Sequence, residues 1–417
     1  MKKASILLVA LMVAAIGLPQ AVCASSDETV EKTFPMKMGG KLELNIETGG
    51  DIEVVGWARE EIAVVVDIAG DDAADVEVEF ETGGSSLTIH SSCGKHRHCD
   101  CDVDFTIKVP SKCDIEVDSR GGAIEIDGVE GKLSGETMGG ALGLSRIKGD
   151  VHLSTMGGSV KVEDSEADGE VSTMGGSVMI RNVKGNLKGS TMGGKVTYEG
   201  VTGRSAESED EEEMDVSTMG GDITIANTPN KVKAKTYGGD IDVGKAKEVN
   251  VSTMGGDINV EEAPEGAHVS TMGGDVTILA AGKYVKASTM GGDVEIRAID
   301  GSAEASTMGG DVIVAMVGDA QKGDRHVELS SLGGDIELTL PAGISAKFDI
   351  EIEYTKNVRK QPKIESEFNM DIKETPEWEH RRGQDHKHIY GTGAVGGGKH
   401  LIKIRTINGN VIVKKGS

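Results

Sequence analysis

The chain has 417 residues, a formal net charge of −25, 59 glycines and only 3% aromatic residues. The negative charge argues against a nucleic-acid-binding protein, because phosphate backbones are bound by clustered Lys and Arg side chains. The hydrophobic content of 37% is too high for a disordered chain, and the lack of a Gly-X-Y period excludes collagen. With so few aromatics, we expect the core to close by stacking of small and β-branched side chains.

The N-terminus has the pattern of an export signal. Two lysines at positions 2 and 3 precede an apolar run over 6–18, which is too short to span a bilayer as a helix. The residues Val22-Cys23-Ala24 after this run resemble a signal-peptidase cleavage site. We therefore predict that residues 1–24 form a cleaved signal peptide. Lipidation at Cys23 is the alternative. No later apolar run reaches membrane-spanning length, so we expect an exported protein that is periplasmic, extracellular or at the cell surface.

One short motif dominates the middle of the chain. The sequence Ser-Thr-Met-Gly-Gly occurs at 154–158, 172–176, 190–194, 217–221, 252–256, 270–274, 288–292 and 306–310. Variants of it occur at 136–140, 235–239 and 330–334, and a degenerate copy occurs at 119–122. Most copies follow one another at a step of about 18 residues, and a fixed short period of this kind is typical of repeat architectures.

Each repeat reads as two short strands. In the copy around Val151–Thr155, apolar and polar positions alternate before the glycine pair, and they alternate again over Val160–Val162, which indicates strands. Such a repeat is too short for a domain but suits one coil of a solenoid. We therefore predict an all-β fold, a parallel β-solenoid (β-helix) over 119–341, with about 18 residues and two short strands per coil. The glycine pairs are expected at corners that need positive φ. An antiparallel propeller or sandwich is the alternative, but propeller blades need about 40 residues.

The two ends differ from the middle. Residues 25–118 and 342–417 also contain alternating segments, such as 42–46 and 402–407. We interpret 25–118 as an N-terminal β region and cap, and 342–417 as a C-terminal extension and cap, because an open sheet edge must be shielded from further pairing. A hinged second domain is the alternative.

Several segments carry a family resemblance. Thr253-Met-Gly-Gly-Asp-Ile258, Thr406-Ile-Asn-Gly-Asn-Val411 and Gly50-Asp-Ile-Glu-Val-Val-Gly-Trp57 resemble the bacterial putative-adhesin family of β-strand repeat proteins, which is related to auto-transporter adhesin head domains. The likeness covers nearly all of 35–417. It implies a repeated β architecture and adhesion, although the family has no settled activity.

An aspartate follows the glycine pair in seven repeats: Asp222, Asp240, Asp257, Asp275, Asp293, Asp311 and Asp335. Coils stacked about 4.8 Å apart would bring these carboxylates close enough to repel. Backbone N–H donors at the turn or bound cations would relieve that repulsion. Aspartate is an ordinary turn residue that bonds backbone groups. Calcium is the alternative, with Asp257, Asp275, Asp293 and Asp311 as candidate ligands, although the calcium-binding nonapeptide repeat is absent.

Nine methionines occupy one position of the repeat: Met138, Met156, Met174, Met192, Met219, Met254, Met272, Met290 and Met308. A row of thioethers could bind Cu(I). Tyr237 and Leu332 take the same position, however, so we predict a steric role. The sequence leaves open whether this column faces the core or solvent. If it faces outward, Met254, Met272, Met290 and Met308 would belong to a contact surface.

Four cysteines remain after the predicted cleavage. An even count in an exported protein predicts two disulfides. Cys93 and Cys99 flank a tight turn and are the preferred pair, which leaves Cys101 and Cys113 as the second. A zinc or copper site using the nearby histidines at 96 and 98 is the alternative, although the cysteine spacing is not a standard zinc framework.

The chain shows no nucleophile elbow, phosphate loop or paired catalytic motif. Near-identical coils, interrupted only by polar excursions at 204–215 and 318–325, favour a repeated binding surface over one catalytic cleft. We therefore expect an exported, non-enzymatic repeat protein that acts as an adhesin-like binding or structural component of the bacterial cell envelope. It should need no cofactor and no nucleic acid, span no membrane, and bind an envelope glycan or protein. The alternatives are a polysaccharide-active β-helix enzyme and a cation-binding envelope protein.

Overall fold

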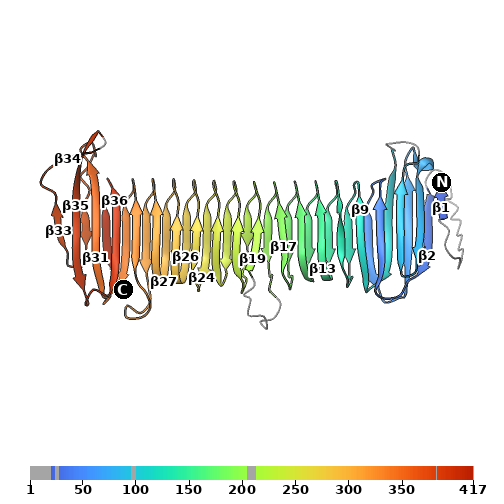
Figure 1. The fold of residues 1–417 in the computed structure, drawn as a ribbon, viewed down its shortest axis with the longest axis horizontal. Coiled ribbons are helices and arrows are strands. Elements are labelled where there is room, and N and C mark those ends of the chain that lie inside the picture. Colours follow the sequence, from blue (N-terminus) through green and yellow to red (C-terminus); the bar gives the residue numbers. More distant parts are fainter. Residues whose placement is uncertain (1–19, 24–27, 95–99, 204–212, 382, 417) are drawn as a thin grey trace, which may run out of the picture. The chain divides into compact units, whose positions relative to one another are not determined.

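The computed structural model describes residues 20–23, 28–94, 100–203, 213–381 and 383–416 (Figure 1). The chain divides into two compact units, Met1–Gly189 (unit 1) and Ser190–Ser417 (unit 2). In the described residues every element is a strand except the short 3₁₀ helix η1 (Ala73–Asp75), so the predicted all-β class is confirmed. None of the helical structure found there has the length and apolar character that a membrane-crossing helix requires.

Unit 1 contains sixteen complete strands in its described residues. They are β1 (Gln20–Cys23), β2 (Glu28–Pro35), β3 (Gly40–Ile46), β4 (Ile52–Trp57), β5 (Glu61–Ala69), β6 (Glu77–Gly83), β7 (Ser86–Ser92), β8 (Asp102–Pro110), β9 (Cys113–Ser119), β10 (Ile124–Asp127), β11 (Leu133–Thr137), β12 (Leu142–Ser145), β13 (Lys148–Thr155), β14 (Val160–Glu163), β15 (Glu166–Thr173) and β16 (Val178–Arg181). The next strand, β17 (Leu187–Thr191), contains the boundary between the units.

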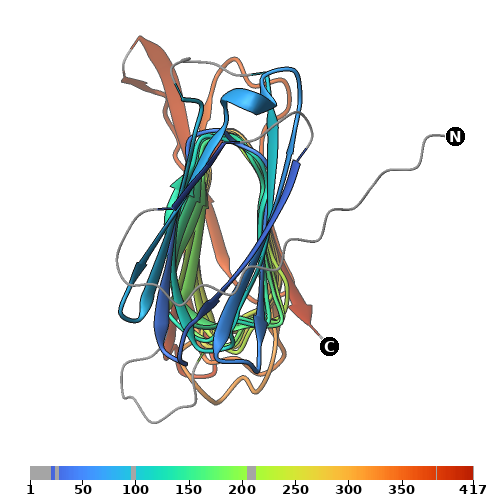
Figure 2. The same ribbon diagram turned by 90° about the vertical axis from the view of Figure 1, so that its right-hand side faces the viewer.

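The repeats of unit 1 stack as parallel coils. In one sheet Ile124 pairs with Leu142, and Leu142 pairs with Val160, so the register advances by one repeat at each step. In the other sheet Leu133 pairs with Val151 at the same offset. Each coil thus gives one short strand to each of two sheets, and Figure 2 shows these strands in two facing layers. Parallel pairing between successive repeats is what the repeat period predicts.

The N-terminal part of unit 1 is arranged out of chain order. Strand β3 lies between β7 and β9, and β4 lies between β8 and β10, with parallel pairing throughout. Strands β7 and β8, which lie between residues 58 and 112, therefore stack on the outer side of the coil formed by β3 and β4. Further out, β5 pairs antiparallel with β8 and β2, and β6 pairs antiparallel with β7 and β1. This change from parallel to antiparallel pairing marks the end of the regular stack.

Unit 2 contains twenty complete strands in its described residues. They are β18 (Val196–Glu199), β19 (Glu213–Ser217), β20 (Ile223–Ile225), β21 (Lys231–Lys235), β22 (Ile241–Lys245), β23 (Glu248–Ser252), β24 (Ile258–Ala263), β25 (Ala267–Ser270), β26 (Val276–Ser288), β27 (Val294–Thr307), β28 (Val312–Met316), β29 (Val327–Ser331), β30 (Ile336–Pro341), β31 (Ala346–Thr355), β32 (Ile364–Ser366), β33 (Asp371–Glu374), β34 (Glu379–Arg381), β35 (Gln384–Val395), β36 (His400–Ile407) and β37 (Val411–Gly416).

The coils of unit 2 keep their register even where the repeat length changes. Ile258 pairs with Val276 across a repeat of ordinary length, whereas Val312 pairs with Ile336 across a longer one. The surplus residues of the longer repeat lie in the connection 317–326 between β28 and β29, so they do not disturb the strands. Strands β26 and β27 are long because each runs continuously from one sheet into the other.

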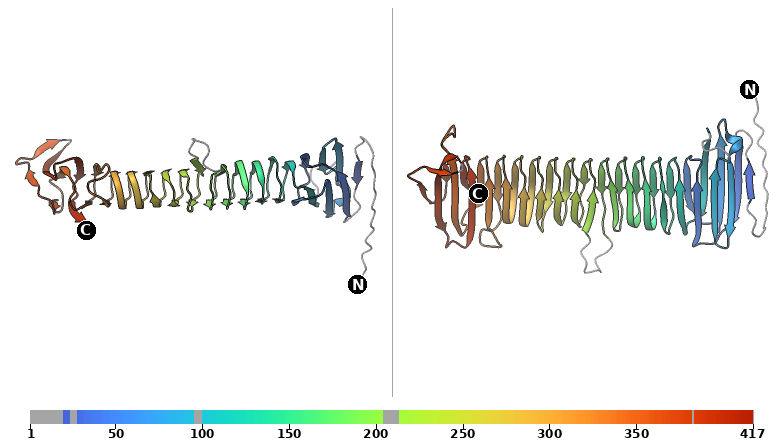
Figure 3. Two further views of the ribbon diagram at one scale, coloured as in Figure 1. Left: turned by 90° about the horizontal axis from the view of Figure 1, so that it is seen from below. Right: turned by 45° about the horizontal axis from the view of Figure 1, so that its top comes forward.

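The C-terminal end of unit 2 also departs from chain order. Strand β36 pairs with β29 on one side and with β31 on the other, both parallel, and β37 lies likewise between β30 and β32. The last coil in the sequence is therefore not the last coil in space. Beyond β31, strand β35 pairs antiparallel, and β33 and β34 pair antiparallel with β35. Figure 3 shows these outer strands in orange to red.

The core between the two sheets of unit 2 is mainly aliphatic, with a few aromatic side chains such as Tyr198 and Phe348. Inward positions repeat in columns, and Ile258, Val276 and Val294 are examples whose side chains are fully buried. Similar branched side chains stacked on one another fill most of the space with few aromatic rings. Burying each of them contributes about 1.5–3 kcal/mol, so the scarcity of aromatics is compatible with a dense core.

Candidate functional site

The repeated motif builds a corner whose threonine points inward. Thr271 is 5% exposed. Its hydroxyl donates to the carbonyl oxygen of Gly256 in the preceding coil at 2.9 Å and accepts from the backbone N–H of Gly274 at 3.4 Å. The same two bonds recur at Thr289 and Thr307. This hydroxyl satisfies buried backbone groups that no aliphatic side chain could satisfy, which explains why the repeat keeps threonine here.

The second glycine of the motif is required because the coils approach closely. A Cβ atom added to Gly274 would lie 2.1 Å from the carbonyl oxygen of Gly256, whereas one added to Gly273 would lie 3.3 Å from that of Gly255. Neither Gly273 nor Gly274 has a positive φ. The expectation that the glycine pair serves positive φ is therefore wrong for this corner. Backbone contact between neighbouring coils is the physical reason instead.

The methionine column faces solvent. In unit 2 the equivalent residues of eight coils form what we call the methionine ridge: Met192, Met219, Tyr237, Met254, Met272, Met290, Met308 and Leu332. Their exposed fractions run from 40% at Met272 to 53% at Leu332. At this corner the hydroxyl of Thr271 points inward, and the side chain of the next residue, Met272, points outward. At about 4.8 Å per coil, seven steps make the ridge about 34 Å long. In unit 1, Met138, Met156 and Met174 are also exposed.

Neighbouring coils are also joined beneath the ridge. The backbone N–H of Gly273 donates to the carbonyl oxygen of Met254 at 3.0 Å, and that of Gly309 donates to Met290 at 3.1 Å. These bonds fix the spacing of the side chains on the ridge. The unbranched thioether side chains above these bonds keep their own rotamer freedom.

The aspartates that follow the glycine pairs form a second row, which we call the aspartate ladder. In each repeat the aspartate comes three residues after the methionine, as Asp275 comes after Met272. The backbone N–H of Asp275 donates to Oδ1 of Asp257 at 2.8 Å, and that of Asp293 donates to Oδ1 of Asp275 at 2.8 Å. The pattern continues to Asp311 and Asp335. Backbone donors therefore provide the first of the two expected means of relieving the repulsion. All of these carboxylates are exposed, so the ladder lines one side of the ridge with negative charge.

The cysteine prediction is partly wrong. Cys101 and Cys113 are both free thiols. Cys101 precedes β8 and Cys113 begins β9, so the extended strand β8 separates them by about 30 Å, and no disulfide can span that length. The Sγ atom of Cys101 instead lies 4.0 Å from that of Cys93. Cys93 is disulfide-bonded, but its predicted partner Cys99 lies outside the described residues, so that pairing stays a prediction.

Burial is the main cause of the raised pKa values of the two thiols. It raises the pKa of Cys113, which is 1% exposed, to about 12. Burial also raises the pKa of Cys101, with a further contribution from the carboxylate of Asp72. Neither thiol is therefore activated as a nucleophile. The alternative metal site involved the histidines at 96 and 98, which lie outside the described residues.

In the part of the chain that the structure describes, one group of three side chains has metal-binding geometry: Asp324, His326 and His400. His400 is 2% exposed. Burial lowers the pKa of His400, and the nearby Lys399 lowers it further, so its imidazole is neutral at pH 7. The group could not be found from the sequence, because His400 lies far along the chain from His326. The only signal was a histidine directly after the excursion at 318–325.

The fold and its surface define an all-β repeat protein with a solvent-facing apolar ridge. Residues 227–414 match the model of the Toastrack DUF4097 family. The predicted resemblance to a family of adhesin-like β repeats without a settled function is thereby confirmed. No curated protein matches the chain.

Several solved structures are remotely similar. One is a putative adhesin from Parabacteroides merdae, with 12% identity over 67% of this chain and 96% of that chain and a TM-score of 0.34. Another is a putative adhesin from Parabacteroides distasonis, with 14% identity over 64% and 97% of the two chains and a TM-score of 0.32. A third is a putative cell adhesion protein from Clostridium sporogenes, with 11% identity over 93% and 100% and a TM-score of 0.18.

Proposed function

We propose that this chain is an exported, non-enzymatic binding protein of the bacterial cell envelope, and that the methionine ridge is its contact surface for a protein partner. The observation that carries the proposal is the exposure of an apolar side chain at the same corner of eight coils. Singly exposed apolar residues are ordinary, but a contiguous stripe of them marks an interaction surface. Export rests on the signal-peptide pattern of residues 1–24.

The chemistry of the ridge favours a polypeptide over a glycan. Methionine side chains adapt to differently shaped apolar partners and are used at binding surfaces that accept varied sequences. The aspartate ladder beside the ridge favours basic side chains on the partner. An extended or helical segment with apolar and basic residues would contact several coils at once. Because the surface repeats, two or more weak contacts along it would combine into tight binding.

The architecture that carries the ridge is also part of the proposal. We infer that the coils of each unit form a solenoid, and that its open edge is covered in unit 1 by strands inserted between residues 58 and 112 and in unit 2 by strands inserted between residues 342 and 399. In both insertions the outermost strands pair antiparallel. An uncovered parallel edge would present unpaired backbone groups to other chains. Covering it would leave the side of the coils, where the ridge lies, as the surface that is free to bind.

The test compares two fourfold variants of the protein without residues 1–24. In the first, Met254, Met272, Met290 and Met308 are changed to Gln, which keeps the side-chain length. In the matched control, four exposed residues of the same coils on the outer face of one sheet are replaced by alanine, namely Asn250, His268, Lys286 and Glu304. Binding to an immobilised bacterial envelope fraction is measured by biolayer interferometry, with and without protease treatment of that fraction.

Each half-exposed methionine that becomes buried should contribute about 1 kcal/mol. Four of them correspond to an affinity loss of at least about a hundredfold. We expect that loss in the methionine variant, unchanged binding in the control, and no binding after protease treatment. Equal binding by both variants would refute the ridge as the contact surface. Binding that survives protease treatment of the fraction would show that the partner is not a protein.

A further inference from the structure

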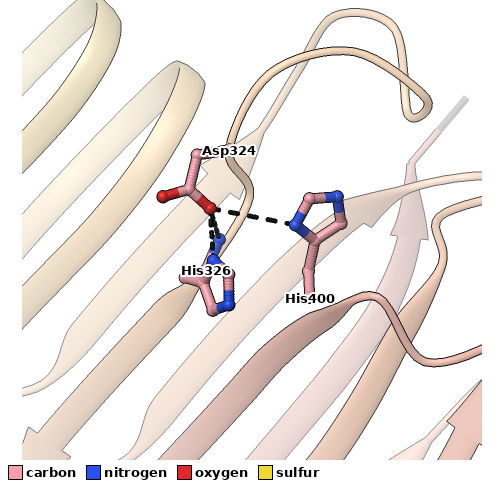
Figure 4. A group of neighbouring side chains, drawn as sticks. All are labelled: Asp324, His326 and His400. Carbon is pink, nitrogen blue, oxygen red and sulfur yellow. Dashed lines mark hydrogen bonds and ion pairs between the residues drawn. The ribbon is translucent and has the colours of Figure 1, made fainter.

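A group of three side chains joins the excursion between β28 and β29 to the returning strand β36. Asp324 and His326 end the excursion, and His400 begins β36 (Figure 4). Val327 pairs with Ile402 in the parallel register, which places the residues before each of them side by side. The backbone N–H of Arg325 accordingly lies 3.3 Å from Nδ1 of His400. Two segments that are distant in sequence thus meet at one point.

The donor atoms of this group are close together and come from a suitable set. Oδ1 of Asp324 contacts Nδ1 of His326 and lies 3.8 Å from Nδ1 of His400. One donor atom from each of the three residues lies within 4.8 Å of the other two. The imidazole rings of His326 and His400 are 5.5 Å apart and nearly perpendicular, at 85°. In a tetrahedral zinc site with zinc–ligand distances of about 2.0–2.2 Å, neighbouring donor atoms are about 3.4 Å apart. Small side-chain rotations would therefore bring the three donor atoms to the separation that zinc requires.

The surroundings leave His400 incompletely satisfied. Its ring is buried, and its Nε2 atom has no hydrogen-bond partner. The single bond to its Nδ1 atom is long. Asp324 and His326 are exposed, so an ion could enter from solvent and keep one position for water. Nδ1 is the ring nitrogen that faces the carboxylate of Asp324 (Figure 4), and a bound ion would replace its one long bond from Arg325, whereas the unpartnered Nε2 lies on the other side of the ring.

The buried guanidinium of Arg325 lies nearby, but it does not repel a metal ion at this site. Alternation along the chain directs the side chain of Arg325 inward, away from Asp324 and His326. Its guanidinium donates to the carbonyl oxygens of Val317 and Asp319, at 2.7 and 3.0 Å, and contacts the carboxylate of Asp300. This charge is neutralised by its own partners. Arg325 also fixes the shape of the excursion that presents Asp324 and His326.

We propose that Asp324, His326 and His400 bind one Zn²⁺ ion through Oδ1, Nδ1 and Nδ1. Two imidazole nitrogens and one carboxylate oxygen are a regular zinc donor set with an open fourth position. The bound ion cross-links the excursion to β36. Because β36 lies between β29 and β31, the cross-link holds the returning coil in its place within unit 2. This role is independent of the methionine ridge, so the failure of either proposal leaves the other standing.

The test uses the purified protein after treatment with a chelator. ZnCl₂ is titrated calorimetrically into the wild type, Asp324→Asn, His326→Gln and the control His268→Gln. His268 is an exposed histidine of β25 in the same unit. Asp324 and His326 are also exposed, so their variants should fold. The same proteins are titrated with Co²⁺, because thiolate ligands would add a charge-transfer band that nitrogen and oxygen ligands lack.

We expect the wild type and His268→Gln to bind one ion per chain without a thiolate band. Asp324→Asn and His326→Gln should lose at least about tenfold in affinity. Zinc should also slow tryptic cleavage at the exposed Lys322 in the wild type and not in His326→Gln. Affinities that are equal in all four proteins would overturn the proposal. So would a thiolate band that persists in both site variants, because the ion would then be held by cysteines.

Discussion

Substitution of the two glycines of one repeat by alanine tests how the coils are held together. In Gly274→Ala the new methyl group would lie 2.1 Å from the carbonyl oxygen and 2.4 Å from the carbonyl carbon of Gly256. Because these are backbone atoms, the coils must separate locally by about 1 Å or more to reach normal contact distance. Separation also weakens the 2.9 Å bond from Thr271 to Gly256. Overpacking costs about 1–3 kcal/mol and the weakened bond about 1 kcal/mol.

Gly273→Ala is the matched control. Its methyl group would lie 3.3 Å from the nearest atom, the carbonyl oxygen of Gly255, so a small adjustment of the backbone suffices. Both variants make the same change to the unfolded chain, and this contribution cancels in the comparison. We expect Gly274→Ala to lose about 2–4 kcal/mol of unfolding free energy and Gly273→Ala less than about 1 kcal/mol. Urea denaturation followed by circular dichroism measures both. Equal losses would refute close approach as the reason for the second glycine.

Three further predictions concern single residues. Thr271→Val keeps the shape but leaves the carbonyl of Gly256 and the N–H of Gly274 without their bonds, so it should cost about 2 kcal/mol in the same urea assay; an unchanged midpoint would contradict the role of the hydroxyl. Met272→Asp should stay folded with a change under about 0.5 kcal/mol, because the site faces solvent, and a large loss of thermal stability would show that the column is buried after all. In native protein, iodoacetamide at mildly alkaline pH should modify Cys101 faster than Cys113, whose pKa of about 12 keeps it protonated; peptide mass mapping that finds these two cysteines joined would restore the second disulfide.

The repeat period was the strongest source of information in the sequence. It placed the glycine pairs, the aspartates and the methionines in columns, because identical residues at a constant interval must occupy equivalent positions. It could not decide where Met272 points. The residue lies at a corner, where the alternation of the strand ends, and only the inward bond of Thr271 fixes the direction of its neighbour.

The wrong cysteine pairing and the missed metal-binding group both depend on distances in the folded chain, which cannot be read from the sequence. The pairing of Cys101 with Cys113 followed from an even count of cysteines, but the extended strand β8 between them keeps them apart. The group of Asp324, His326 and His400 was invisible for the opposite reason. Its members are brought together only because β36 returns past an insertion to lie beside β29.

The position of β36 and β37 also governs the order in which the molecule can be completed. The chain leaves the ribosome with its N-terminus first, so the residues that pair with β29 and β30 emerge only after the insertion 342–399. Until then, β29 and β30 have no strand to pair with on their outer side. The strands of the insertion are already present, but in the finished unit β31 and β32 pair with β36 and β37 and not with β29 and β30. Contacts between residues distant in sequence form slowly because a long loop must close first. This end of unit 2 can therefore be completed only after β36 and β37 have emerged, and a chain that stops before residue 400 would keep an open edge that a chaperone or a second copy could occupy.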